Sequence, residues 1–222
     1  RNKEMILHVY DVAVKSGAGD VLVVTPDQKI FDLLKNYGAK CMISKNNHET
    51  GTDRVFEAFK NFFSCQPENI INLQGDMPNL NPKDIVSIKK YLEYKKCDIC
   101  TLGSELNKKE RIDKNIVKVL TKKSIKNSDF TEVSDFKRQV TDEENSLIYH
   151  HIGIYGFTNQ ALMRYVNFKR SKLEIERNLE QMRAMENNLK IHVGYSNSKP
   201  LSVDTKEDLL EIKKIMEINE KI

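Results

Sequence analysis

Two short segments of the sequence each place an aspartate between a strand-like run and the start of a helix. They are QGDMP at 74–78, which contains Asp76, and LSVDT at 201–205, which contains Asp204. In open α/β sheets, ligands bind beyond the carboxyl ends of the strands. Magnesium prefers hard oxygen ligands and keeps substrate phosphates in its shell, so strand-end aspartates suffice for such a site. The plainer alternatives are a turn residue for Asp76 and a helix cap for Asp204.

The segment HETGTDR at 48–54 opens a predicted helix with a glycine, small hydroxyl residues and a charged pair. Its backbone N–H groups and Arg54 are suited to receive an anion or the edge of a base. A capped helix with Arg54 as a solvated surface charge explains the same residues. The sequence leaves both interpretations open.

A third group of polar residues lies in the second half of the chain. His150 and His151 are neighbours in a predicted strand, so they point to opposite faces and at most one faces a pocket, where it is a plausible donor to an acidic substrate. Glu180, Gln181 and Arg183 interrupt or flank the apolar stripe of a predicted helix. They could reach sugar hydroxyls, although a solvated helix face is the plainer interpretation.

The elements that must position these residues alternate between strand and helix in the first half of the chain. The hydrophobic pattern predicts helices at 5–14, 29–37, 51–63 and 82–94, and strands at 21–25, 41–44 and 69–73. This βαβ rhythm predicts an α/β fold with a mixed, mostly parallel, doubly wound sheet. No strand precedes the first helix, so we expect that an N-terminal strand is missing from the sequence.

The rhythm changes after about residue 100. Strands are predicted at 97–102, 115–120, 152–157 and 191–195, and the polar stretch at 121–146 has no readable pattern. A capping box at Ser171 and Glu174 predicts one long helix, and Thr205 with Asp208 predicts a terminal helix to about Glu217.

The composition bounds the class of protein. At 222 residues, with 39% hydrophobic and 31% charged residues, the chain fits one domain spanning 1–222 and contains no run apolar enough to insert in a membrane. The net charge of +4 is dispersed, which argues against a nucleic-acid partner. Four irregularly placed cysteines and the lack of a signal peptide predict a reducing compartment, and the CxxC at Cys97 and Cys100 is interpreted as buried packing.

Several blocks, taken in order, resemble the 3-deoxy-manno-octulosonate cytidylyltransferase family, also called CMP-Kdo synthetases. The blocks are HETGTDR, NLQGDMP, HHIGIYGF, SKLEIERNLEQMRAMENNLKIHV and SVDTKEDL. Five blocks in the right order are a specific signal, and the LEQ-R-x-x-E block favours this family over other sugar nucleotidyltransferases.

The resemblance implies a Rossmann-like nucleotide-diphospho-sugar transferase fold, a homodimer in the cytoplasm, and magnesium-dependent transfer of CMP from CTP to Kdo, an acidic eight-carbon sugar, for lipopolysaccharide synthesis. It implies a nucleotide-binding half at about 1–100 and a sugar-binding and dimerisation half at about 101–222. The residue roles that it implies are Asp76 and Asp204 as catalytic magnesium ligands, Arg54 and Gln74 against the substrates, and His151, Tyr155, Glu180 and Gln181 around the sugar.

Two departures from the family pattern keep alternatives open. The Arg- and Lys-bearing phosphate loop of the family is absent from the sequence, and the SRxxIP segment has no match between Ser124 and Val140. The alternatives are a cytidylyltransferase for amino-Kdo or sialic acid, a non-catalytic nucleotide-sugar binding protein, and a zinc or thiol-redox protein built on the CxxC.

Overall fold

A computed structural model describes residues 3–45, 47–62, 66–94, 97–126, 130–141 and 147–219 of the chain. Tertiary contacts divide the chain into two compact units. Unit 1 comprises Arg1–Phe62, Leu73–Val86 and Ser198–Ile222, and unit 2 comprises Phe63–Asn72 and Ser87–Asn197. Each unit joins segments that are distant in sequence. The organisation as one domain with two functional halves stays a prediction.

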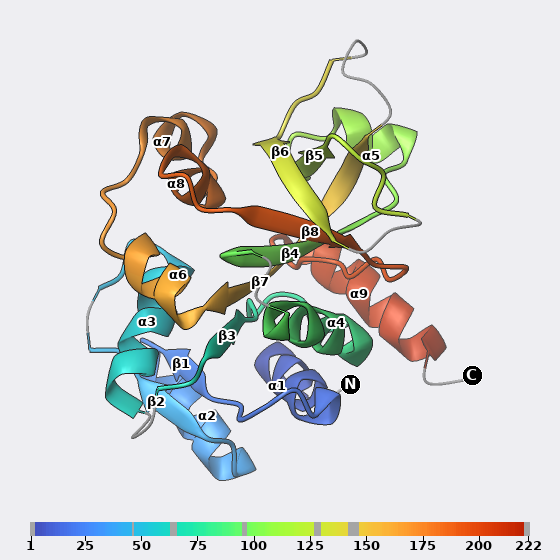
Figure 1. Cartoon of the computed structure of the whole chain (residues 1–222). Coiled ribbons are helices and arrows are strands. Elements are labelled where there is room, and N and C mark those ends of the chain that lie inside the picture. The colour runs from blue at the N-terminus through green and yellow to red at the C-terminus, as the bar shows by residue number, and fades with distance from the viewer. Residues whose placement is uncertain are drawn as a thin grey trace. The chain divides into compact units, whose positions relative to one another are not determined.

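Unit 1 is built from the N-terminal elements and the C-terminal helix (Figure 1). Its elements are α1 (Met5–Ser16), β1 (Val23–Thr25), α2 (Gln28–Tyr37), β2 (Cys41–Ile43), α3 (Gly51–Phe62), the start of α4 (Pro82–Glu93), and α9 (Lys206–Asn219). Strands β1 and β2 pair in parallel. These elements confirm the helices and strands that the hydrophobic pattern predicts for this part of the chain.

Local side-chain chemistry fixes the ends of the unit 1 helices. The Asp27 carboxylate caps α2 by accepting hydrogen bonds from the first free backbone N–H groups of that helix. The helix ends at Gly38, which adopts the left-handed conformation with φ 81°. Leu7, Leu34 and Ala39 form the buried cluster between α1, α2 and the following strand. Burial of this cluster holds the small parallel ribbon against the two helices.

Unit 2 contains a six-stranded sheet with the order β3-β7-β4-β8-β6-β5, in which β5 also pairs with β7. Its elements are β3 (Asn69–Asn72), β4 (Ile99–Ser104), α5 (Lys108–Ile112), β5 (Lys118–Thr121), β6 (Thr131–Lys137), β7 (Ile148–Thr158), α6 (Asn159–Tyr165), α7 (Lys172–Arg177), α8 (Gln181–Glu186) and β8 (Ile191–Tyr195). Strand β4 is buried at every position, because neighbouring strands flank it on both sides.

The sheet pairings confirm the mixed α/β class. Strand β4 pairs in parallel with β8, whereas β7 runs antiparallel to β3, β4 and β5. The antiparallel pairings outnumber the parallel ones in the described part of the chain, so the parallel share is smaller than the βαβ rhythm indicates. The reason is that β7 runs antiparallel to three strands and β6 runs antiparallel to β5 and β8.

Two predictions for the second half are wrong in detail. The stretch at 121–146 contains strand β6, whose alternating burial is masked by its charged residues. The long helix predicted from Ser171 is divided into α7 and α8 at Asn178, which adopts the left-handed conformation with φ 51°. Asparagine tolerates this conformation better than most residues, so it ends α7 although the apolar stripe continues. Helices α5 and α6 lie where no element is predicted.

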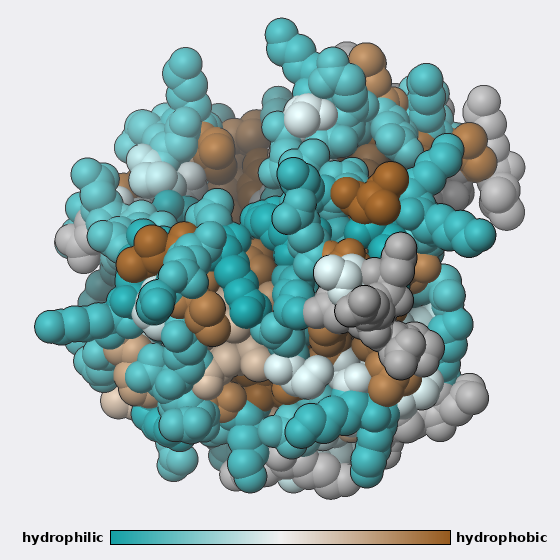
Figure 2. Space-filling view, turned by 90° about the horizontal axis from the view of Figure 1, so that it is seen from above, coloured by the Kyte–Doolittle hydropathy of each residue, from teal (hydrophilic) through white to brown (hydrophobic). Residues whose placement is uncertain are grey.

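The exposed surface carries polar and charged side chains with small, separate apolar patches on the face that Figure 2 shows. This pattern agrees with the dispersed net charge of the sequence. Among the described residues, none of the helices combines the length and the apolar character needed to cross a membrane.

Candidate active site

In unit 1, the structure brings the carboxylates of Asp76 and Asp204 together through one hydroxyl group. The Ser202 Oγ lies 3.0 Å from Asp76 Oδ2 and 3.3 Å from Asp204 Oδ2. A backbone hydrogen bond of 3.0 Å from Val203 N to Asp76 O fixes the two segments side by side. The two strand-end aspartates therefore form one site, although they are 128 positions apart in the sequence.

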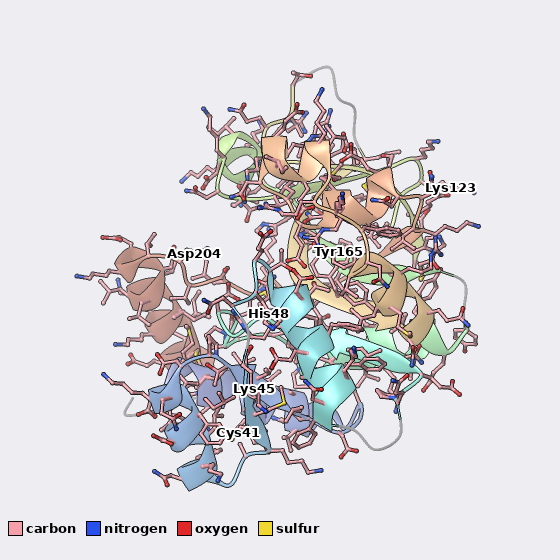
Figure 3. All side chains as sticks on the ribbon, turned by 90° about the vertical axis from the view of Figure 1, so that its left-hand side faces the viewer. Cys41, Lys45, His48, Lys123, Tyr165 and Asp204 are labelled. Atoms are coloured by element: carbon pink, nitrogen blue, oxygen red, sulfur yellow. The ribbon has the colours of Figure 1, made fainter. Side chains whose placement is uncertain are left out.

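The local hydrogen bonds show that Asp204 is not the cap of α9. Asp208 Oδ2 accepts from the backbone N of Asp204 and of Thr205 at 3.1 and 2.8 Å, and the Thr205 hydroxyl accepts from Asp208 N at 3.1 Å. Thr205 and Asp208 thus share the capping role that the sequence predicts for them. The Asp204 carboxylate remains directed to Ser202, and Figure 3 shows it just before α9.

The environment of Asp76 favours a positively charged ligand. Burial, with a smaller contribution from the charge of Asp204, raises the pKa of Asp76, although the hydrogen bond from Ser202 opposes this shift. Asp76 Oδ1 is buried and has no hydrogen-bond partner among the described residues. A hard cation would satisfy this oxygen and neutralise the paired charges, so the two aspartates fit a magnesium ion. The described residues contain no group of three or more His, Cys, Asp or Glu side chains that could hold a metal by themselves.

The loop that carries HETGTDR is held by the buried carboxylate of Glu57 on α3. Glu57 accepts hydrogen bonds from Ser44 Oγ at 2.9 Å and from Lys45 N at 2.8 Å, and it contacts His48 Nε2 at 2.5 Å. One carboxylate therefore binds the start of the segment between β2 and α3 and His48 within it, and Figure 3 labels Lys45 and His48. No sequence pattern identifies Glu57, because a glutamate on an amphipathic helix normally faces solvent.

Arg54 and Gln74 occupy different environments in unit 1. Thr50 and Asp53 cap the start of α3 with hydrogen bonds of 2.7 and 3.3 Å, which leaves Arg54 outside the cap. Arg54 is half-buried, and its Nε has no hydrogen-bond partner among the described residues. The burial of Nε favours a ligand-facing Arg54 over a fully solvated surface charge, and its role toward a substrate stays a prediction. Gln74 is exposed in the turn before Asp76, where its amide is accessible to a ligand.

In unit 2, His151 is buried and hydrogen-bonded to Thr101. Its Nε2 lies 3.0 Å from Thr101 Oγ1, which also lies 2.7 Å from the carbonyl oxygen of Ile154. The single hydroxyl proton of Thr101 goes to the carbonyl, which can only accept, so His151 must donate from Nε2. Burial, with a smaller effect of His150, lowers the pKa of His151 to about 3.

The neutral His151 ring therefore carries its proton on Nε2 and can only accept at Nδ1. The expectation that this histidine donates to an acidic substrate does not fit this tautomer. Its ring contacts the rings of Phe136 and Tyr155, with centroid distances of 5.1 and 5.4 Å. Phe136 lies on β6, so the stretch at 121–146, which has no readable pattern, contributes a side chain that packs against His151.

Tyr155 and Glu180 are close enough to interact electrostatically. Burial, together with the charge of Glu180, raises the pKa of Tyr155 well above its ordinary value, so its hydroxyl stays protonated and can donate. Glu180 is the residue before α8 and Gln181, which is buried, is the first residue of that helix. The structure thus brings His151, Tyr155 and Glu180 to one part of unit 2, with Gln181 next to them in the chain. Their roles toward a sugar stay predictions.

Arg183 is neither solvated nor directed to a ligand. Its guanidinium forms two hydrogen bonds of 2.8 and 2.7 Å with the Glu174 carboxylate, and both side chains are almost fully buried. The expectation that Arg183 reaches sugar hydroxyls is therefore wrong. Its partner lies nine positions earlier in the chain, beyond the break at Asn178, and one continuous helix would not bring the two side chains together in this way.

His150 and the cysteines lie outside the predicted site. His150 Nδ1 lies 3.6 Å from Glu110 Oε1, so the two neighbouring histidines have different partners, as the strand prediction requires. Cys97 and Cys100 are buried free thiols, which agrees with their interpretation as packing residues. Burial raises the pKa of the Cys100 thiol well above its ordinary value, which makes it a poor nucleophile. Cys65 lies outside the described residues.

Comparison with known proteins connects this geometry to a family. Residues 1–191 match the sequence model of the cytidylyltransferase family. A 3-deoxy-manno-octulosonate cytidylyltransferase of Bartonella tribocorum is 37% identical over 216 residues, which cover 96% of this chain and 88% of the relative. A protein of the same name from Brucella ovis is 34% identical and covers 93% of this chain and 83% of the relative.

Solved structures agree with the fold. The structure of CMP:2-keto-3-deoxy-manno-octonic acid synthetase complexed with CTP superposes with a TM-score of 0.86 at 26% identity and covers 98% of this chain and 89% of that chain. A UDP-glucose pyrophosphorylase complexed with UDP-glucose superposes with a TM-score of 0.70 at 13% identity, covering 98% of this chain and 88% of that one, and at this identity it supports the fold alone.

The fold and these matches define the protein as a nucleotidyltransferase with the mixed α/β fold of nucleotide-sugar transferases. The two aspartates joined by Ser202 lie in segments that carry the resemblance to this class. The chain belongs to the cytidylyltransferase family, and specifically to the 3-deoxy-manno-octulosonate cytidylyltransferases.

Proposed function

We propose that the protein transfers CMP from CTP to the anomeric hydroxyl of Kdo and releases pyrophosphate. The observation that carries the proposal is the pair of carboxylates, Asp76 and Asp204, joined by Ser202 in a chain whose relatives are named as Kdo cytidylyltransferases. The reaction is an in-line attack on the α-phosphorus, which requires alignment and neutralisation of charge more than a protein nucleophile.

Asp76 and Asp204 would hold the magnesium ion. When bound, the ion would neutralise phosphate charge and orient the α-phosphate. Asp76 contributes the buried Oδ1 that has no protein partner in the described part of the chain, and Ser202 keeps the two carboxylates at a fixed separation. Fixing the ligands before binding reduces the conformational entropy that the site must lose.

The remaining predicted site residues would bind the substrates. In unit 1, Arg54 offers a half-buried guanidinium and Gln74 an exposed amide to CTP. In unit 2, the geometry supports an acceptor at His151 Nδ1, a donor at the Tyr155 hydroxyl and an acceptor at Glu180. Such a mixture of acceptors and donors matches a polyhydroxylated sugar better than an apolar one.

The test measures pyrophosphate release by the full-length protein with CTP, Kdo and magnesium. We expect Asp76→Asn to lower kcat by about a hundredfold or more, because a metal ligand acts in the transition state. Ser202→Ala is expected to lower kcat about tenfold through the loss of a charge-assisted hydrogen bond. Ser198→Ala is the matched control, since its hydroxyl donates to the Asp84 carboxylate in the same unit. Full activity of Asp76→Asn contradicts the proposal.

Substrate controls separate the alternatives. Turnover with sialic acid or amino-Kdo in place of Kdo would assign the enzyme to a different acidic sugar. CTP binding without turnover of any acidic sugar would favour a non-catalytic binding protein. Replacement of CTP by ATP tests the base preference.

We further propose that the enzyme is a magnesium-dependent homodimer of the cytoplasm, where CTP is made, and that its product serves lipopolysaccharide synthesis. Family resemblance supports these statements. Light scattering of the purified protein measures the dimer, and a monomer at working concentrations contradicts it.

A further inference from the structure

The side chain of Tyr165, at the end of α6, contacts Glu180, the predicted sugar-binding residue that precedes α8. The Tyr165 hydroxyl lies 3.1 Å from the backbone oxygen of Glu180 and 3.3 Å from its Oε1. Tyr165 is 1% exposed, so this contact is formed in a buried environment where water does not compete with it. Figure 3 labels Tyr165 within the cluster of elements that forms this part of unit 2.

The Tyr165 ring is itself fixed by a buried ion pair. The Arg183 guanidinium lies over the ring, with Cζ 4.7 Å from the centroid. Arg183 is held by Glu174 through two hydrogen bonds. Phe157 packs against the Tyr165 ring with a centroid distance of 6.0 Å. Because the ring contacts both Arg183 and Phe157, the hydroxyl has little freedom to leave Glu180.

Glu174 connects this support to the start of α7. Its carboxylate accepts from Ser171 N at 3.1 Å and from Arg170 Nε at 3.2 Å, and its own backbone N–H binds the Ser171 hydroxyl. Because this carboxylate is saturated with donors, the charge of Arg183 is balanced and its position is defined. The support therefore runs from the first turn of α7 through Arg183 and Tyr165 to Glu180.

The Glu180 side chain makes no capping hydrogen bond to α8, so the start of that helix does not fix its orientation. Phe157, which packs against the Tyr165 ring, also packs against the Tyr155 ring with a centroid distance of 6.3 Å. Tyr165 and Glu180 therefore lie in the same part of unit 2 as the predicted sugar-binding residue Tyr155. The contact between the Tyr165 hydroxyl and Glu180 Oε1 restricts the orientation of the carboxylate. A side chain that is already immobilised before the sugar arrives loses less entropy on binding.

We propose that Tyr165 is a positioning residue that orients the Glu180 carboxylate toward the hydroxyl groups of the acidic sugar. The proposal rests on the proposed function, because it names the support for one residue of that same site. Tyr165 acts through Glu180 and does not touch the substrate in this account.

The test compares Tyr165→Phe, which removes one oxygen and keeps the ring, with Tyr149→Phe as the matched control. Tyr149 is also buried in unit 2, and its hydroxyl accepts from Ile125 N at 3.3 Å. We expect Tyr165→Phe to raise the KM for Kdo about three- to tenfold, the effect of one immobilised side chain, and to leave the KM for CTP within twofold. Tyr149→Phe should leave both KM values within twofold.

A double-mutant cycle with Glu180→Gln separates positioning from general destabilisation. If Tyr165 acts through Glu180, Tyr165→Phe has no further effect on the KM for Kdo in the Glu180→Gln background. An unchanged KM for Kdo in Tyr165→Phe, an equal rise of both KM values, or additive effects in the cycle would overturn the proposal alone. Absence of wild-type turnover with Kdo would overturn the proposed function and this inference with it.

Discussion

Replacement of Asp76 by asparagine is expected to stabilise the metal-free protein while it abolishes activity. The carboxylate is half-buried, its Oδ1 lacks a hydrogen-bond partner among the described residues, and the charge of Asp204 is nearby. A buried polar atom without a partner costs about 1–3 kcal/mol, and partial exposure places Asp76 at the lower end of that range. A gain of about 1 kcal/mol in a chain of this length raises Tm by about 2–4 °C.

The stability gain from Asp76→Asn should depend on pH in a defined direction. The pKa of Asp76 is raised in the folded protein, so folding favours the protonated form. The resulting destabilisation is absent below the ordinary aspartate pKa, develops between that value and the raised pKa, and is complete once the pH exceeds the raised pKa. The gain from Asp76→Asn should therefore be full at pH 7.5 and disappear toward pH 4.

Differential scanning fluorimetry with a chelator measures this gain, and repetition with magnesium and CTP measures ligand binding. The wild-type Tm should rise with the ligands, whereas the Tm of Asp76→Asn should not. Asp84→Asn is the control, because Asp84 is buried but accepts a hydrogen bond from Ser198. A lower or unchanged Tm of Asp76→Asn at pH 7.5 without metal, or a gain that does not vary with pH, would refute the reasoning.

Three further predictions concern unit 2. Gly156→Ala is expected to lower the free energy of unfolding, measured with urea, by about 1–3 kcal/mol, because the new Cβ would lie 2.5 Å from a side chain of α4. Gly19→Ala is the control and should be near neutral, because its Cβ would meet nothing within 4 Å. Arg177→Ala should lower the free energy of unfolding by about 1 kcal/mol through the loss of its hydrogen bonds to Asp135 Oδ1 (2.5 Å) and the Phe136 carbonyl (2.8 Å), and the exchanged pair Arg177→Asp with Asp135→Arg should recover part of this loss. With its pKa lowered to about 3, His151 should show no titration near pH 6.5 by NMR. As the pH falls from about 6.5 toward 3, the free energy of unfolding should decrease by up to about 1.4 kcal/mol per pH unit because of this residue. His151→Gln should remove this contribution to the slope.

The elements that the sequence predicts best are those whose ends are set by residues close to them in the sequence. Helix α2 begins at Asp27 and ends at Gly38, and both residues act through local hydrogen bonds that need no tertiary context. The sequence predicts the two strand-end aspartates for the same reason, because each lies between a strand-like run and a helix start. Their contact through Ser202 is a tertiary fact that a single sequence does not contain.

The sequence does not predict strand β6, because its pattern of polar and apolar residues does not distinguish it from a loop. Its sequence TEVSDFK alternates in burial, but acidic and hydroxyl residues occupy most positions. The strand is stabilised by tertiary contacts: Phe136 is fully buried, and Arg177 binds Asp135 and the Phe136 carbonyl from α7. Where packing and long-range hydrogen bonds decide the conformation, local propensity is a weak guide.

The LEQ-R-x-x-E block shows why a motif can identify a family without revealing the role of each residue. Glu180 and Gln181 lie at the start of α8, and their contact with a sugar stays a prediction, whereas Arg183 and Glu186 bind residues of α7. Arg183 binds Glu174, and Glu186 Oε2 accepts from Leu173 N at 2.9 Å. The break at Asn178 makes both contacts possible, because it folds α8 back on α7. Contacts between α8 and α7 therefore account for the positions of Arg183 and Glu186 in the block without any role toward a substrate.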